Sequence, residues 1–159
     1  MMSLLNFAEG IIMAFFKSTV LALALVAGVS LAAQAEDHAA HTWPDGAAAY
    51  IVSPANGATV KSPVTVIFGL KGMGVAPAGI EKPKTGHHHL LIDTPAPSGE
   101  DLDYAIPADD QHVHFGGGQT ETTVTLAPGK HTLQLMMGDA NHVPHNPPLV
   151  SEVVTITVK

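Results

Sequence analysis

The feature that most limits the fold is the division of the chain, from about residue 50 onward, into short alternating segments separated by Pro and Gly. Apolar and polar side chains alternate in each segment, which is the pattern of a half-buried strand, and no window sustains a helical stripe. The segments are residues 50–53, 64–70, 88–92, 122–126, 132–137 and 153–158. Many short strands joined by turn-rich breaks predict an all-β fold, namely an antiparallel immunoglobulin-like β-sandwich, with a small barrel as the alternative.

The alternation also assigns the two faces of each predicted strand. In HHHLLID, Leu90 and Ile92 lie on one face, so His88 shares the core side as a satisfied buried histidine or as a ligand at the edge of the core. His87 and His89 then face outward together, about 7 Å apart along the strand. In the segments 64–68 and 133–137 the predicted core residues are Val64, Val66, Phe68, Leu133, Leu135 and Met137.

The first 35 residues have the pattern of an export signal. Lys17 precedes an apolar run at residues 20–33, and Ala33-Gln34-Ala35 is a small-residue cleavage site, so residues 1–35 are predicted to be a signal peptide, with Met13 as the true start. The protein is therefore expected to be periplasmic or secreted, with no lasting membrane insertion. Residues 36–49 are predicted to be a flexible leader before a folded domain at residues 50–159.

Composition limits the chemistry of the exported part. Residues 36–159 contain no Cys and no Arg, and six Lys stand against thirteen Asp and Glu. A metal site in this part must use His, Met, Asp, Glu or backbone oxygen. The acidic balance repels nucleic acid, which is therefore not an expected partner.

Ten histidines are present, and most lie in three clusters. These are HHH at residues 87–89, HVH at residues 112–114, and the loop HVPH at residues 142–145. Imidazole is the commonest metal ligand in proteins, and His-x-His on an extended segment places both rings on one side. Pro144 restricts the third cluster, as a preorganised ligand loop requires.

The convergence of these clusters predicts a metal site. Its centre is predicted to be His89, His114, His142 and His145. Three further histidines, His87, His88 and His112, are alternates, and Asp139 is expected either to orient an imidazole or to serve as an additional ligand.

The other potentially reactive residues do not indicate a second functional site. His131 keeps the register of the core residues Leu133 and Leu135, so it is interpreted as a hydrogen-bonded histidine at the margin of the core. No serine lies in a nucleophile-elbow context, and no Gly-rich loop opens a helix. Neither a catalytic residue nor an organic cofactor is predicted.

The motifs GMGVAPAG, TGHHHLLID, HVHFGGGQTET, PGKHTLQLMMGD and HVPHNPPLVSE resemble a family of small secreted bacterial proteins. The family is defined only as domain of unknown function 4399, and its members are sometimes misnamed rod shape-determining proteins. The resemblance covers residues 50–158, nearly the whole predicted domain. It implies no settled activity. A true shape-determining protein of that name would cross the membrane many times, whereas this chain has one apolar leader.

Two other sandwich groups supply analogies for function. Small periplasmic copper carriers hold copper with exposed histidines, and the segment HVHFG is similar to the ligand strand of copper/zinc superoxide dismutases. Those enzymes, however, use a disulfide and an arginine that this chain lacks. The main hypothesis is therefore a carrier or sensor of copper, or else of zinc, with a periplasmic metal-accepting protein as partner. The alternatives are a structural or interaction module with a histidine hydrogen-bond network, and a dismutase-like metalloenzyme.

Overall fold

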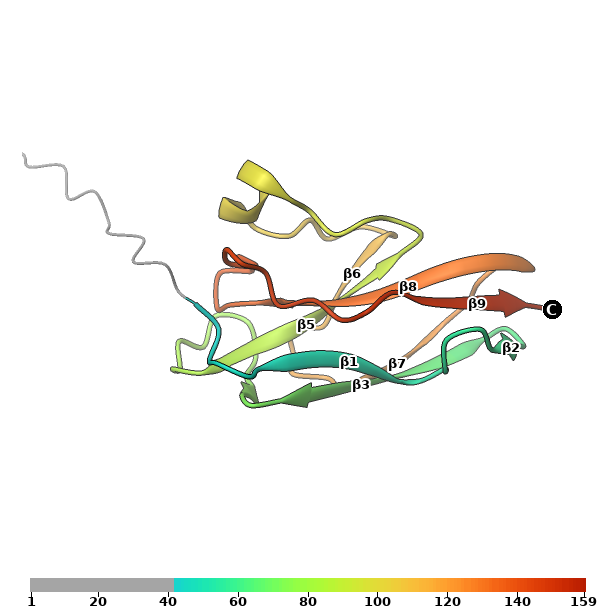
Figure 1. Cartoon of the computed structure of the whole chain (residues 1–159), viewed down its shortest axis with the longest axis horizontal. Coiled ribbons are helices and arrows are strands. Elements are labelled where there is room, and N and C mark those ends of the chain that lie inside the picture. The colour runs from blue at the N-terminus through green and yellow to red at the C-terminus, as the bar shows by residue number, and fades with distance from the viewer. Residues whose placement is uncertain (1–41) are drawn as a thin grey trace, which may run out of the picture. The chain divides into compact units, whose positions relative to one another are not determined.

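The computed structural model describes residues 42–159, which form two β-sheets (Figure 1). The three-stranded sheet has the order β1 (Ala48–Ser53), β3 (Val64–Lys71), β7 (Glu121–Val124). The six-stranded sheet runs β2 (Thr59–Val60), β9 (Val154–Val158), β8 (Gly129–Gly138), β5 (Thr85–Ile92), β4 (Gly74–Val75), and β6 (His112–His114) also pairs with β5. One short 3-10 helix, η1 (Gly99–Asp103), lies in the connection between β5 and β6. Within residues 42–159 no helix has the length and apolar character to cross a membrane.

All six strands expected from the sequence are present, so the all-β prediction is confirmed. The pairing is mostly antiparallel, but β2 pairs with β9 and β4 pairs with β5 in parallel. The six-stranded sheet is therefore mixed, and the expectation of purely antiparallel pairing was wrong in this respect. The strands β2 and β4 are each only two residues long, which is too short for a periodic pattern in the sequence.

A single main core lies between the two sheets. The six core residues expected from the alternation are all buried, and side chains from β5 and β9 join them. Alternation produces this result because every second side chain of a strand points to the same face of its sheet. On the opposite face of the three-stranded sheet, Tyr50 is exposed and its ring lies across Gly69, its partner in register.

The outer face of the six-stranded sheet is also covered. The β5 side chains that point away from the main core are His87, His89 and Leu91, and a second apolar cluster forms there from Leu91, Leu102, Ile106 and Met136. Leu102 and Ile106 come from the connection between β5 and β6, and Figure 1 shows η1 and its flanking loops on the side of the sheet opposite β1 and β3. This covered face positions the candidate site.

The folded part begins before the boundary expected from the sequence. Residues 48 and 49 belong to β1, and Trp43 packs against the main core while its Nε1 donates a hydrogen bond to the carbonyl oxygen of Pro144 at 2.9 Å. The predicted leader therefore includes residues that pack on the domain. The predicted signal peptide lies outside the described residues.

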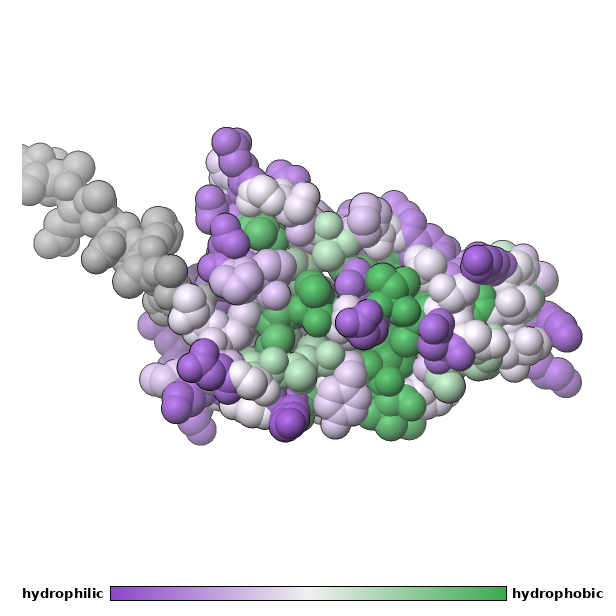
Figure 2. Space-filling view, in the orientation of Figure 1, coloured by the Kyte–Doolittle hydropathy of each residue, from purple (hydrophilic) through white to green (hydrophobic). Residues whose placement is uncertain are grey.

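Figure 2 shows apolar side chains reaching the surface of the domain. The large apolar residues that are exposed include Tyr50, Val52 and Ile67 on the three-stranded sheet and Val153 before β9. Much of the surface of any folded domain is apolar, so these residues alone do not mark a binding site.

Candidate metal centre

Strand pairing brings three histidines together on the outer face of the six-stranded sheet. His87 and His89 alternate along β5, and His89 is the register partner of His114 on β6. Directly opposite residues of an antiparallel pair project to the same face with their Cβ atoms about 5 Å apart. On the other side of β5, His87 is opposite Gly138 of β8, which has no side chain to fill the space.

The three imidazoles are close enough to share one ion. One ring nitrogen from each of His87, His89 and His114 lies within 4.8 Å of the others. Among residues 42–159, the buried ring nitrogens without a hydrogen-bond partner include both of His87, both of His89 and Nε2 of His114. Buried polar atoms in folded proteins nearly always have a partner. These three histidines could therefore bind a metal ion.

A fourth ring, that of His142, lies beside this group. Its centre is 4.7 Å from that of His114, 5.0 Å from that of His87 and 6.1 Å from that of His89. His142 has a left-handed backbone with φ of 70°, and Gly138 leaves space for it. A Cβ at position 138 would be 2.8 Å from Cε1 of His89 and 3.2 Å from Cα of His142.

Backbone hydrogen bonds fix the loop that carries His142. The Asp139 carboxylate accepts the N–H groups of Asn141 at 2.7 Å and Val143 at 2.9 Å. The carbonyl of His142 in turn accepts the N–H of Ile106 at 2.9 Å. The loop is thus joined to the segment that covers the outer face, and both help to enclose the cluster.

The environment favours the neutral imidazole at His87, His89 and His114. Burial, followed by the neighbouring imidazoles, lowers the pKa of His87 to about 4 and that of His89 to about 3, while Asp139 opposes the shift at His87. Burial, followed by the proximity of His142, also lowers the pKa of His114. Neutral imidazole is the form that ligates a metal, so the site holds its donors in the binding form.

The structure separates the remaining predicted site residues from this cluster. His88 points into the main core, where its ring centre is 5.2 Å from that of Phe68. His112 Nδ1 lies 2.8 Å from the Asp109 carboxylate. The ring centre of His145 is 4.6 Å from that of Trp43, and its Nε2 lies 3.6 Å from the carboxylate of Asp139.

Two sequence expectations about this site differ from the structure. His87 and His89 point away from the main core, as expected, but that face is covered and both side chains are fully buried, which the sequence did not predict. Asp139 was expected to orient an imidazole or to bind the metal, but its carboxylate mainly accepts hydrogen bonds from backbone N–H groups of its own loop. Gly138 and Trp43 were not assigned to the surroundings of the site from the sequence. The sequence offered only two indications of their role: Gly138 precedes Asp139, and Trp43 is the single tryptophan of the chain.

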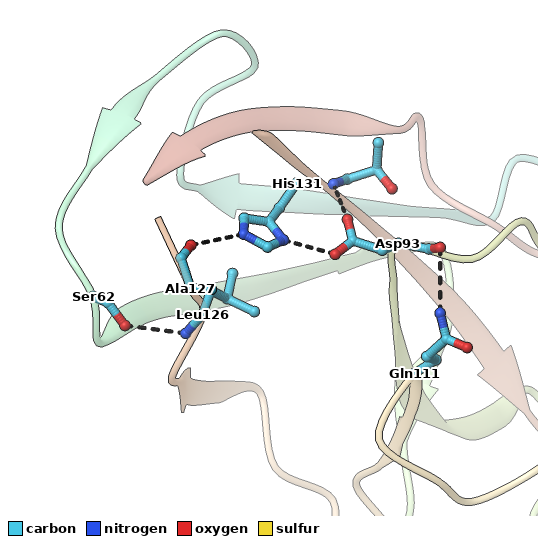
Figure 3. A network of polar contacts seen from close by, with 7 residues as sticks. Ser62, Asp93, Gln111, Leu126, Ala127 and His131 are labelled. Carbon is cyan, nitrogen blue, oxygen red and sulfur yellow. Dashed lines mark hydrogen bonds and ion pairs between the residues drawn. The ribbon is translucent and has the colours of Figure 1, made fainter. Parts of the chain in front are cut away.

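His131 lies apart from the cluster and has a structural role, as expected. Its Nδ1 lies 2.7 Å from the Asp93 carboxylate and its Nε2 lies 2.9 Å from the carbonyl oxygen of Ala127. Figure 3 shows both contacts. Both neighbours are acceptors, so the protonated ring satisfies both contacts, and the hydrogen bond to Asp93 raises the pKa of His131. Asp93 also accepts the N–H of Thr132 at 2.7 Å.

Replacing His131 by Ala is expected to lower the free energy of unfolding by about 1 to 3 kcal/mol, because the charged hydrogen bond to Asp93 is lost. The raised pKa means that this contribution is complete below about pH 6.5 and disappears as the pH rises through the folded-state value. Urea denaturation of both proteins at pH 6 and pH 9 measures the effect. A difference that grows toward alkaline pH would contradict the assignment.

Comparison with known proteins identifies the family. A family model described as a domain of unknown function (DUF4399) matches residues 66–159. The chain belongs to this family. The DUF4399 match contains all four clustered histidines. Comparisons with curated proteins and with solved structures found no match.

Proposed function

We propose that this protein is an exported metal-binding protein that holds one transition-metal ion at His87, His89 and His114 and acts as a carrier or sensor. The observation that carries the proposal is the convergence of buried ring nitrogens that have no hydrogen-bond partner. The proposal includes removal of residues 1–35 as a signal peptide, a periplasmic or secreted location, and the immunoglobulin-like classification of the two-sheet fold.

The contrast with His131 supports metal binding over a histidine hydrogen-bond network. Both nitrogens of His131 have acceptors, as a structural histidine requires. Each buried polar group left without a partner costs about 1 to 3 kcal/mol. A network kept for stability would bond the nitrogens of His87 and His89. His88 in the main core also has two buried nitrogens without a partner, so the convergence of His87, His89 and His114, and not the missing partners alone, supports metal binding.

The imidazole ligands limit which metal ion the site can bind. Imidazole nitrogen suits copper and zinc, and Cu(II) has the highest affinity for such donors in the divalent series, so affinity alone ranks copper before zinc. His114 and His142 are only partly buried, and this is the side from which a periplasmic acceptor protein would take the ion. The proposed role requires ligand exchange but no reaction centre.

Metal analysis of the protein purified without a histidine tag tests this proposal. We expect about one Cu or Zn ion per chain after equilibration with each metal. Replacing His89 by Leu should reduce the content to background, because it removes a donor at the centre of the cluster. His131→Gln is the matched control and should retain the ion, since His131 lies outside the cluster. Equal metal content in wild type and His89→Leu would overturn the proposed site.

A further inference from the structure

We infer that His142 is the fourth ligand of a closed tetrahedral site and that the resident ion is Zn(II). This inference rests on the proposed function of the same site and names its metal. It starts from the relative positions of the four rings, His87, His89, His114 and His142. Their six centre-to-centre distances are 4.8, 5.0, 5.0, 5.0, 6.1 and 4.7 Å.

These distances fit a tetrahedron better than a square. All six separations are equal in a tetrahedron, whereas a square has two diagonals about 1.4 times as long as its sides. Only the distance between His89 and His142 is long, at 6.1 Å. The opposite diagonal would join His87 to His114, and it is 5.0 Å, no longer than the sides.

The absolute size of the group also fits one bound ion. Four imidazoles whose nitrogens lie about 2.1 Å from a tetrahedral ion have ring centres about 5 Å apart. Five of the six distances lie between 4.7 and 5.0 Å. The ring nitrogens within 4.8 Å of one another belong to His87, His89 and His114 but not to His142. Completing the set therefore requires a movement of His142 toward His89, and His142 is the one member of the four that a loop carries.

The donor chemistry then selects the ion. Zn(II) takes four nitrogen or sulfur ligands in tetrahedral geometry, whereas Cu(II) prefers tetragonal sites and Cu(I) prefers sulfur. The chain has no cysteine, and the four side chains supply only neutral nitrogen. Strands fix three of these ligands and so limit rearrangement toward a square. This geometry weakens the usual advantage of Cu(II) and favours Zn(II).

A matched pair of variants isolates the role of His142. His142 and His145 lie on the same loop, and both have left-handed backbones, with φ of 70° and 67°. Asn tolerates this conformation better than most residues. His142→Asn therefore removes the imidazole with little backbone strain, and His145→Asn makes the same change outside the cluster.

Co(II) titration of the metal-free protein is the test, because tetrahedral Co(II) absorbs visible light much more strongly than octahedral Co(II). We expect wild type and His145→Asn to show strong bands that saturate at about one equivalent and disappear when Zn(II) is added. In His142→Asn a water molecule would replace the fourth imidazole, so the bands should shift and become pH-dependent, and Zn(II) should bind at least about tenfold more weakly. Thermal melting checks that each variant folds, and His142→Gly replaces His142→Asn if the latter does not.

The possible failures are distinguishable. If wild type binds none of Co(II), Zn(II) or Cu(II), the proposed function fails and the inference fails with it. If wild type binds one Co(II) with weak octahedral bands, or if His142→Asn leaves the spectrum and the Zn(II) affinity unchanged, the inference is overturned. The proposed three-histidine site then survives.

Discussion

A melting temperature about 15 °C higher with excess Zn(II) than with a chelator is expected for the wild-type protein. An ion that binds only the folded chain adds about 4 kcal/mol when its free concentration is a thousandfold above the dissociation constant. For a domain of this size, 1 kcal/mol corresponds to roughly 4 °C. The unfolded chain cannot reproduce the site, since its ligands come from β5, β6 and the loop after β8. Differential scanning calorimetry at fixed protein concentration measures the shift.

The His89→Leu variant makes this result specific. It should lose the rise with Zn(II), while its melting temperature in chelator should equal or exceed that of the wild type. The reason is that Leu removes two buried nitrogens that have no hydrogen-bond partner in the metal-free protein. A structural histidine network predicts the reverse, namely no effect of Zn(II) and a marked loss of stability in the variant. That outcome would lead us to abandon the metal site.

The sequence predicted the strands and the main core well, because alternation is a direct property of a strand that packs on one face. Val66 and Leu135, for example, are fully buried as the period-two pattern requires. The strands β2 and β4 have two residues each, which is too short for a periodic pattern, and the partner of β2 lies at the far end of the chain in β9. Trp43 shows the same limitation, since its packing depends on Pro144, about a hundred residues away.

The site was only partly predictable for related reasons. Alternation placed His87 and His89 on one face, but it did not reveal that the connection between β5 and β6 covers that face. From that connection, Leu102 and Ile106 join the apolar cluster over the sheet and Ala96 packs against it, and so few residues make no periodic pattern.

The choice between similar histidines also required the structure. Register decides between His112 and His114, because only His114 is opposite His89. The hydrogen bonds to Asp139 shape the loop that directs His142 toward the cluster, while His145 lies against Trp43. Neither the register nor the direction of the loop can be deduced from the spacing of residues.

Acid should unfold the metal-free protein near pH 5. Burial holds the pKa of His87 and His88 at about 4 and that of His89 at about 3 in the folded protein. The unfolded values lie near 6.5. Above about pH 6.5 all three are neutral in both states and contribute nothing. Below it, only the unfolded chain gains protons, so stability falls as the pH falls toward the folded-state values.

The expected size of this effect makes it measurable. Each proton withheld from the folded protein costs about 1.4 kcal/mol per pH unit, so three histidines together cost about 4 kcal/mol per unit. Between about pH 6.5 and pH 5 the loss is about 6 kcal/mol, comparable with the whole stability of many domains. Urea denaturation in chelator across this range measures the slope. A free energy of unfolding that stays constant from pH 7 to pH 5 would show that these imidazoles are not held neutral.

His88 separates the effect of burial from that of the metal site. It lies in the main core against Phe68, away from the cluster, so His88→Leu should reduce the acid slope by about one third and leave Zn(II) binding intact. His131 cannot account for the slope, because its pKa is raised and its contribution is lost at alkaline pH. Bound Zn(II) should move the acid midpoint of wild type and of His88→Leu to lower pH, since protons must then displace the ion as well. The same ion should not move the midpoint of His89→Leu, and this difference joins the acid response to the proposed ligands.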